Sequence, residues 1–212
     1  MLDKKIFDHK FDEDQHIYVI ERFNPNFEKE NITNIIITFH GVVNRLKRTF
    51  PPRPGINFKL QENFIWYQIC DPLLFENKDL STSFYLGSNK MTYVGEIEKY
   101  LKSNFKKFKN LKNVCYLGAS ASATIAFRLA NSIGGYCFLF NPILYIRNYY
   151  KSYIYKLLEH WSIDEESLYN YQESLISISL KKLEKVVIVN NATDFNHNIN
   201  QTFEFYKAFL TH

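Results

Sequence analysis

The chain has 212 residues, of which 46% are hydrophobic and 23% are charged, and its formal net charge is +4 at pH 7. These values are typical of a folded globular protein and exclude an intrinsically disordered chain. The densest basic group, Lys99 to Lys112, follows a helical pattern and is interpreted as a solvated helix face, with a polyanionic partner as the alternative. Because no aromatic-interleaved motif accompanies these lysines, we expect no nucleic-acid partner.

Three further features concern the compartment. No stretch approaches 18 uninterrupted apolar residues, so we expect no membrane span. The first residues, Met1 to Lys5, lack the apolar segment of a signal peptide. Cys70, Cys115 and Cys137 are an odd set, each within an apolar run, which is typical of buried free thiols rather than disulfides. We therefore expect a cytoplasmic protein.

Apolar runs of strand length alternate with helical patterns along the chain. In chain order we predict strands at 16–23, 34–39 and 64–70, a helix at 93–108, a strand at 113–117, a helix at 121–132, a strand at 136–140, a helical stretch at 149–180, a strand at 185–189 and a closing helix at 202–210. Strands separated by helices predict an α/β fold with a mostly parallel sheet covered by helices on both faces.

The helical stretch 149–180 is longer than a crossover connection needs, so it could form a small cap over a site. Within it, Ser162–Glu165 resembles a capping box that opens another helix. No repeat, low-complexity tract or Pro/Gly linker interrupts the chain, and we expect residues 1–212 to form one domain.

The strongest local motif is Gly118–Ser122 (GASAS), between a buried strand and an amphipathic helix. A nucleophile at such a turn has a strained backbone and needs small neighbours, which predicts Ser120 as the attacking residue. The helix N-terminus would aim backbone N–H groups at a developing oxyanion, with Ala121 as the first donor. Ser122 stands where the G-x-S-x-G pattern has its last Gly. The alternative is a tight turn with a capping serine.

A second motif, His40-Gly41, directly follows the strand that ends at Phe39. In α/β hydrolases the loop at this place donates the second N–H of the oxyanion hole. Here Val42, or Gly41 itself, would be that donor. The alternative is an exit turn that needs Gly41, with His40 as a packing residue.

A serine nucleophile needs a general base, and His197 is the favoured candidate. It lies with Asp194 just after the last predicted strand, where loops at the carboxyl ends of parallel strands line the ligand crevice. The order Ser, Asp, His is that of α/β hydrolases, and the carboxylate would orient the imidazole. Asp71 and Asp164 are alternative acids, and a polar turn that caps the last helix is the non-catalytic interpretation. The other histidines lie in or before the first strand, in the helical stretch or at the last residue (His9, His16, His160 and His212).

Several short motifs occur in a characteristic order: Cys70–Leu74 (CDPLL), Phe84–Gly87 (FYLG), the serine turn, Phe140–Pro142 (FNP) and Asn191–His197 (NATDFNH). In this the chain resembles, over about residues 34–206, the α/β-hydrolase-like proteins of bacterial capsule and surface-polysaccharide biosynthesis, which include capsular O-acetyltransferases. The resemblance implies a triad of Ser120, Asp194 and His197 and a sugar or glycan hydroxyl as acyl acceptor.

The leading hypothesis is acyl transfer through an acyl-Ser120 intermediate, as an esterase when water is the acceptor or an O-acyltransferase when a sugar hydroxyl is. A dry aromatic pocket would favour transfer, and the Tyr-rich stretch 145–155 could supply one. We expect no bound cofactor and no metal. The substrate would be a small molecule or a glycan, with acetyl-CoA as a candidate acyl donor, and the sequence indicates no particular oligomeric state. The alternative is a non-catalytic binding or assembly protein of polysaccharide biosynthesis on the same scaffold. A nucleotide-binding domain is disfavoured, because the turn at Gly118 has one glycine where a dinucleotide fingerprint needs three.

Overall fold

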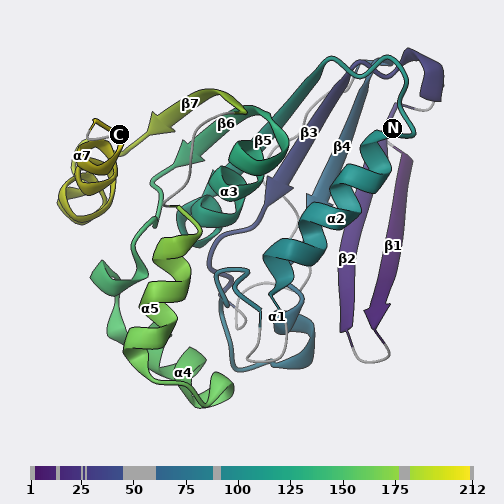
Figure 1. The fold of residues 1–212 in the computed structure, drawn as a ribbon. Coiled ribbons are helices and arrows are strands. Elements are labelled where there is room, and N and C mark those ends of the chain that lie inside the picture. Colours follow the sequence, from purple (N-terminus) through teal and green to yellow (C-terminus); the bar gives the residue numbers. More distant parts are fainter. Residues whose placement is uncertain are drawn as a thin grey trace.

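The computed structural model describes residues 3–12, 15–24, 26, 28–44, 61–87, 92–176 and 182–210, with residues 3–16, 196, 209 and 210 described by their backbone alone. His212 and the end of the predicted stretch 149–180 lie outside the described residues. Within these ranges seven strands form one sheet in the order β1-β2-β4-β3-β5-β6-β7 (Figure 1). The strands are β1 (Asp3–Asp12), β2 (Gln15–Phe23), β3 (Asn34–Phe39), β4 (Phe64–Ile69), β5 (Asn113–Ala119), β6 (Gly135–Phe140) and β7 (Leu183–Val189).

The sheet is mostly parallel, as predicted. Strands β4, β3, β5, β6 and β7 run parallel, whereas β2 is antiparallel to both β1 and β4. All six predicted strands are present, and β1 is an additional strand that the sequence pattern did not predict. Thr38 pairs with Leu117, and Phe140 pairs with both Ala119 and Val189. The loops that leave β3, β5, β6 and β7 therefore start at one edge of the sheet.

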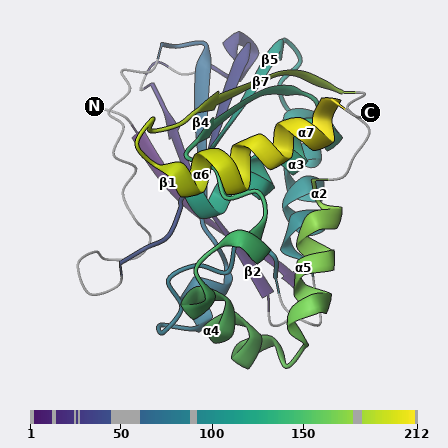
Figure 2. The same cartoon turned by 90° about the vertical axis from the view of Figure 1, so that its left-hand side faces the viewer.

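Helices flank this sheet (Figure 1). Helix α2 (Tyr93–Phe105) buries Val94, Ile97 and Leu101, and it packs beside α3 (Ala123–Ile133) in front of the strands. The shorter or later helices are α1 (Leu73–Glu76), α4 (Lys151–Trp161), α5 (Glu165–Ser174), α6 (Phe195–His197) and α7 (Glu204–Leu210). A π-helical turn, Asn198–Phe203, joins α6 to α7, and together they run along the β7 edge (Figure 2).

Two predicted helix boundaries are wrong in detail. Asp164 is the N-cap of α5, with its carboxylate accepting from the Ser167 N–H at 2.8 Å, whereas Ser162 ends α4 in the left-handed region at φ 54°. Asp fits the cap because its carboxylate reaches the free N–H groups of the first turn. The closing helix begins before the predicted residue 202, since α6 and the π turn precede α7.

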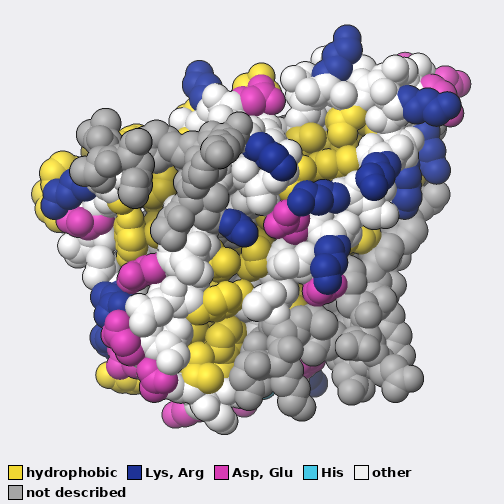
Figure 3. Space-filling view, in the orientation of Figure 1, with side chains coloured by type: hydrophobic (Ala, Val, Ile, Leu, Met, Phe, Trp, Pro, Cys, Tyr) yellow, Lys and Arg dark blue, Asp and Glu magenta, His cyan; other side chains and the backbone are white. Residues whose placement is uncertain are grey.

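Surface and thiol predictions can also be compared with the structure. The lysines between Lys99 and Lys112 are exposed, and two of them pair with Glu96 and Glu98 on the same helix. Lys99 and Lys102 lie on α2, and the other four follow its end. Figure 3 shows basic side chains with acidic ones among them on this face of the molecule, and the exposure of all six lysines confirms a solvated face. None of the three cysteines forms a disulfide within the described residues, as predicted. Cys70 and Cys137 are buried, whereas Cys115 is only partly buried. Among the helices of the described ranges, none has both the length and the apolarity to cross a membrane.

Candidate active site

The candidate nucleophile lies where β5 ends and a 3-10 turn, Ser120–Ser122, leads into α3. Ser120 has φ 51°, a left-handed conformation that costs a non-glycine residue about 1–2 kcal/mol. Gly118 makes this turn possible, because a Cβ there would stand 2.7 Å from both the Ala126 Cβ and the Ser122 carbonyl oxygen. Such strain concentrates at functional sites, so its presence at Ser120 favours a functional role over a simple capping turn.

Ser122, which replaces the last glycine of the pattern, stabilises the turn. Its buried hydroxyl accepts from the Ala119 N–H at 2.9 Å. The hydroxyl proton lies within reach of the carbonyl oxygens of Ala119, at 3.0 Å, and Phe39, at 3.2 Å. Ser122 in place of glycine therefore does not disturb the serine turn, and its hydroxyl links this turn to the end of β3.

The loop after β3 lies against the serine turn. A Cβ on Gly41 would come within 2.8 Å of the Ala119 carbonyl oxygen and 3.4 Å of the Ser120 Cβ, so glycine is what permits the approach. Among the described residues, the N–H groups of Gly41 and Val42 donate no hydrogen bond, whereas the next one, that of Val43, donates to the Ser81 carbonyl at 2.8 Å. The loop predicted to complete an oxyanion hole thus lies beside Ser120, and the role of its donors stays a prediction.

His40 has a structural place in this loop. Its Nε2 accepts from the Asp71 N–H at 3.0 Å, and its Nδ1 lies 2.9 Å from the Gly41 carbonyl oxygen. A neutral imidazole with its proton on Nδ1, assigned from these partners, satisfies both contacts. His40 therefore holds the loop in place, which matches the packing interpretation of this residue.

The two alternative acids are engaged elsewhere. The buried Asp71 carboxylate accepts from the N–H and the hydroxyl of Ser83, at 2.9 and 2.5 Å. It lies close to Tyr85, whose pKa is raised well above its usual value by burial and by this carboxylate. Asp164 caps α5, as described above. Both carboxylates thus have structural partners, which leaves Asp194 as the candidate for the triad.

Asp194 and His197 form a pair within one turn. The Asp194 Oδ2 lies 2.7 Å from His197 Nδ1, off the line of the ring N–H, and the Asp194 Oδ1 accepts from the His197 backbone N–H at 3.2 Å. The His197 side chain is only 13% exposed. Its Nε2 is buried and makes no hydrogen bond within the described residues.

The segment after β6 connects the serine turn to the loop that carries this pair. Asn141, at φ 40°, donates its N–H to the Val189 carbonyl at 2.8 Å, and its side-chain oxygen accepts from the Asn191 N–H at 2.6 Å. Two residues later, the Ile143 N–H donates to the Ser120 carbonyl at 3.0 Å. The segment that leaves β6 is thus hydrogen-bonded to the exits of both neighbouring strands, β5 and β7.

Tyr149 is a residue of the site that the motifs did not identify, although the Tyr-rich stretch was noted. Its ring centroid lies 6.4 Å from that of His197. Burial and the neighbouring Tyr153 and Tyr150 raise the pKa of Tyr149 to about 12, against a smaller lowering by the nearby Ser120 side chain. Tyr149 therefore lies near both Ser120 and His197. Ser120 and His197 are not hydrogen-bonded to each other here, since Nε2 has no partner in the described chain.

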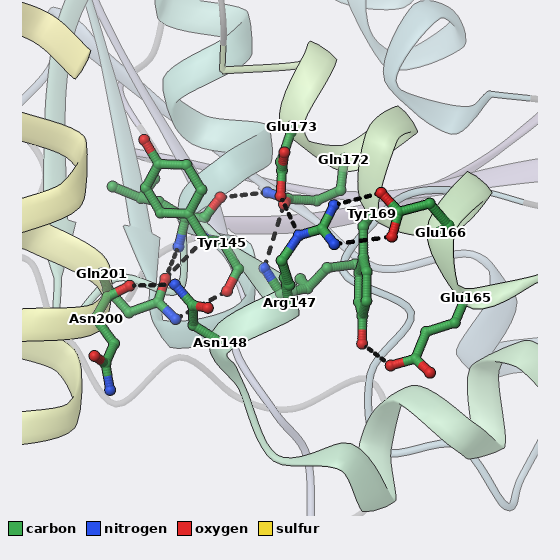
Figure 4. A network of polar contacts seen from close by, with 12 residues as sticks. Tyr145, Arg147, Asn148, Glu165, Glu166, Tyr169, Gln172, Glu173, Asn200 and Gln201 are labelled. Atoms are coloured by element: carbon green, nitrogen blue, oxygen red, sulfur yellow. Dashed lines mark hydrogen bonds and ion pairs between the residues drawn. The ribbon is translucent and has the colours of Figure 1, made fainter.

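Two buried glutamines fix the segment that leads to Tyr149 (Figure 4). The Gln201 side chain accepts from the N–H groups of Leu144 and Tyr145, at 2.8 and 2.7 Å, and donates to the Tyr145 carbonyl at 2.9 Å. The Gln172 side chain donates to the Leu144 carbonyl and accepts from the Ile146 N–H at 3.3 Å. Because Gln201 follows His197 in the π turn, the same contacts also tie that turn to this segment.

The described residues offer no group of three or more His, Cys, Asp or Glu side chains that could hold a metal ion.

No family model and no curated protein sequence matches the chain. Among solved structures, the capsule O-acetyltransferase of Neisseria meningitidis serogroup A is similar, with a TM-score of 0.67 and 15% identity over 95% of this chain and 83% of that one. Porphyromonas gingivalis dipeptidyl peptidase 4 has a TM-score of 0.66 at 10% identity, over 99% of this chain and 30% of that one. Pyrococcus horikoshii acylaminoacyl peptidase has a TM-score of 0.61 at 10% identity, over 99% of this chain and 35% of that one.

These identities make the likeness one of fold. The chain has the α/β-hydrolase fold, which confirms the predicted fold class. It spans about a third of the length of the two peptidases and most of the length of the O-acetyltransferase. Activity and substrate are argued separately, since one fold serves many functions.

Proposed function

We propose that the protein catalyses acyl transfer through an acyl-Ser120 intermediate. The Ser120 Oγ attacks the carbonyl carbon of an ester or thioester, while its proton passes to His197 Nε2. The tetrahedral intermediate collapses with release of the alcohol or thiol, which takes that proton. An acceptor hydroxyl then gives its proton to His197 and attacks the acyl carbon. The second tetrahedral intermediate collapses as the bond between the acyl carbon and Ser120 Oγ breaks, and His197 returns the proton to Oγ. Asp194 orients the imidazole and stabilises its charged form.

The observation that carries this proposal is the strained backbone of Ser120 at φ 51°, at the exit of β5 and beside the Gly41 loop. The N–H groups of Gly41, Val42 and Ala121 are the proposed oxyanion donors. Gly41 supports this assignment because it lies against the serine turn, and Ala121 because it is in the first helical turn, where N–H groups lack intrahelical partners.

For the substrate, we propose a bacterial surface polysaccharide or its sugar precursor, with the protein acting as an O-acyltransferase or esterase. The sequence motifs support this choice, and so does the fold likeness that spans 83% of a capsule O-acetyltransferase. Acetyl-CoA would enter as the acyl-donor substrate. Because an acyl-enzyme route needs only the groups named above, the proposal requires no bound cofactor.

The second candidate is a non-catalytic binding or assembly protein on the same scaffold. The observation in its favour is the missing hydrogen bond between Ser120 and His197 Nε2. Catalytic hydrogen bonds are often long before substrate binds, so this alone does not decide between the two.

Labelling with a serine-directed fluorophosphonate, followed by mass-spectrometric mapping, tests nucleophilicity without knowledge of the substrate. We expect the native protein to be modified at Ser120 and the Ser120→Ala variant to remain unmodified. Ser103→Ala, which changes an exposed serine on α2, is the matched control and should react like the native protein. A folded native protein that leaves Ser120 unlabelled would favour the non-catalytic candidate. Turnover of acetyl-CoA or an aryl acetyl ester, with and without a sugar acceptor, then separates transferase from esterase.

A further inference from the structure

The Tyr85 hydroxyl lies between the ends of strands β3 and β4, where the loop with the proposed oxyanion donors begins. The last paired residues of these parallel strands are Phe39 and Ile69. If the ladder continued, its next hydrogen bond would run from the His40 N–H to the Ile69 carbonyl. Instead, the Tyr85 hydroxyl accepts from the His40 N–H at 3.0 Å and donates to the Ile69 carbonyl at 3.1 Å. A side-chain hydroxyl thus takes the place of one ladder hydrogen bond.

The following ladder hydrogen bond is replaced in the same way. In a continued ladder the Asp71 N–H would donate to the His40 carbonyl, but it donates to His40 Nε2 at 3.0 Å. The His40 carbonyl oxygen lies 3.4 Å from the Tyr85 hydroxyl, farther than that of Ile69. The rings of His40 and Tyr85 lie 5.4 Å apart between centroids. Two side chains therefore separate the strand ends, and the backbone after Phe39 leaves the sheet.

Tyr85 reaches this position from a strained segment. Phe84 and Tyr85 have φ values of 54° and 58°, a left-handed conformation that is unusual for aromatic residues. The Tyr85 side chain is fully buried and packs edge-on against Phe39, at 5.5 Å between centroids. The N–H and the hydroxyl of the preceding Ser83 both donate to the buried Asp71 carboxylate. Backbone strain persists only where the surroundings hold it, and it concentrates at functional positions.

The hydroxyl of Tyr85 does more than fill space. Burial and the nearby Asp71 carboxylate raise the pKa of Tyr85 well above its usual value, so the hydroxyl stays protonated and can donate to the Ile69 carbonyl. A phenylalanine would keep the ring but leave the His40 N–H and the Ile69 carbonyl without a partner between them. Because unpaired buried backbone groups are costly, we expect the two strand ends to close on each other, which would draw Gly41 away from the serine turn.

We propose that Tyr85 is a positioning residue for the oxyanion hole, whose hydroxyl keeps the ends of β3 and β4 apart and so holds the backbone of Gly41 and Val42 against the serine turn. This inference rests on the proposed acyl-transfer function. The required approach is close, since a Cβ on Gly41 would come within 2.8 Å of the Ala119 carbonyl oxygen. Because Tyr85 is fully buried, it acts through this loop rather than by contact with substrate.

The test compares Tyr85→Phe with Tyr116→Phe. Tyr116 is also fully buried, and its hydroxyl has no hydrogen-bond partner among the described residues, so phenylalanine removes no such contact there. The rate constant for fluorophosphonate labelling of Ser120 is measured together with kcat and KM for an aryl acetyl ester, below the melting temperature of both variants. We expect Tyr85→Phe to lower the labelling rate and kcat roughly 10- to 100-fold with KM unchanged, because oxyanion donors act on the transition state. Tyr116→Phe should react like the native protein.

A double variant shows whether Tyr85 acts through the loop. Gly41→Ala displaces the same loop, so the effects of Tyr85→Phe and Gly41→Ala on the labelling rate should not multiply. The double variant should be about as slow as the slower single variant. A merely structural role would leave the rate of the folded protein unchanged and would lower only its melting temperature.

Three results would overturn the inference: a native rate in folded Tyr85→Phe, an equal loss in Tyr116→Phe, or effects of Tyr85→Phe and Gly41→Ala that multiply. If Tyr85→Phe does not fold, Tyr85→4-aminophenylalanine replaces it. Its amino group can donate to the Ile69 carbonyl but accepts poorly from the His40 N–H, so slow labelling is again expected, and a native rate would count against the inference. Failure of the proposed function looks different, because the native protein would then show no labelling of Ser120 at all.

Discussion

Replacement of Ser120 by glycine should make the protein more stable than replacement by alanine. Both variants lose the side-chain hydroxyl, so their difference isolates the backbone. At φ 51°, alanine keeps a strain of about 1–2 kcal/mol that glycine does not have. Glycine loses about 0.4–1 kcal/mol through the greater freedom of the unfolded chain. The net difference is about 0.5–1 kcal/mol in favour of glycine, or roughly 2 °C in melting temperature for a chain of this length.

The assay is thermal unfolding of the two variants under identical conditions. The same pair of substitutions at Ser103, inside α2 and exposed, provides the control. There glycine should be less stable than alanine by about 1 kcal/mol, since the backbone is helical. The predicted signature is thus an inversion of sign between the two sites. If Ser120→Gly melted at or below Ser120→Ala, the backbone at Ser120 would not be strained, and the structural argument for a nucleophile there would lose its basis.

Two further predictions concern the loop and the glutamines around the site. Gly41→Ala should slow the labelling of Ser120 at least tenfold, because the new Cβ would stand 2.8 Å from the Ala119 carbonyl oxygen in the serine turn. The control is Gly95→Ala in α2, whose new Cβ would stand 3.3 Å from the Thr92 hydroxyl oxygen, and this variant should be labelled at the native rate. Gln201→Leu should lower the free energy of unfolding by about 2–5 kcal/mol, because the buried N–H groups of Leu144 and Tyr145 lose their acceptor. The control is Gln61→Leu at an exposed position, which should change the free energy by less than about 0.5 kcal/mol. Urea unfolding of both variants measures the difference.

The strands that could be predicted from the sequence are those whose apolar residues indicate that the strand is buried. The run Asn34–Phe39 matches β3 in full, because its three consecutive isoleucines and Phe39 form the apolar run that is expected of a strand covered on both faces. Strand β1 has no such signature, since residues 3–12 include only Ile6, Phe7 and Phe11 as apolar residues. It belongs to the sheet through backbone pairing with β2, which any sequence can make. Hydrophobic patterns therefore miss an edge strand of this kind.

The same reasoning explains which parts of the site were predictable. Ser120 lies in a short motif whose small residues are required locally, and the Asp194–His197 pair is contained in one turn. The cap of α5 was misassigned because Ser162 and Asp164 are both good caps, and the choice depends on where α4 ends. Tyr149 could not be identified from sequence, because its ring contact with His197 joins residues 48 positions apart through the fold.

The hydrogen bonds of the helical stretch between β6 and β7 indicate how this stretch supports the proposed site. The sequence suggested a cap over the site, a role that stays a prediction. The observed bonds show that α5 and the π turn hold the segment 144–148 through side chains that a pattern would assign to the surface, namely Gln172 and Gln201. A buried glutamine can satisfy a backbone N–H and a backbone carbonyl at once, which an apolar residue at the same place cannot do. Because Gln201 lies one turn after His197 and the segment it holds ends at Tyr149, a shift of this glutamine would move both side chains relative to Ser120. The buried polar contacts are therefore the part of the structure on which the geometry of the proposed site depends most directly.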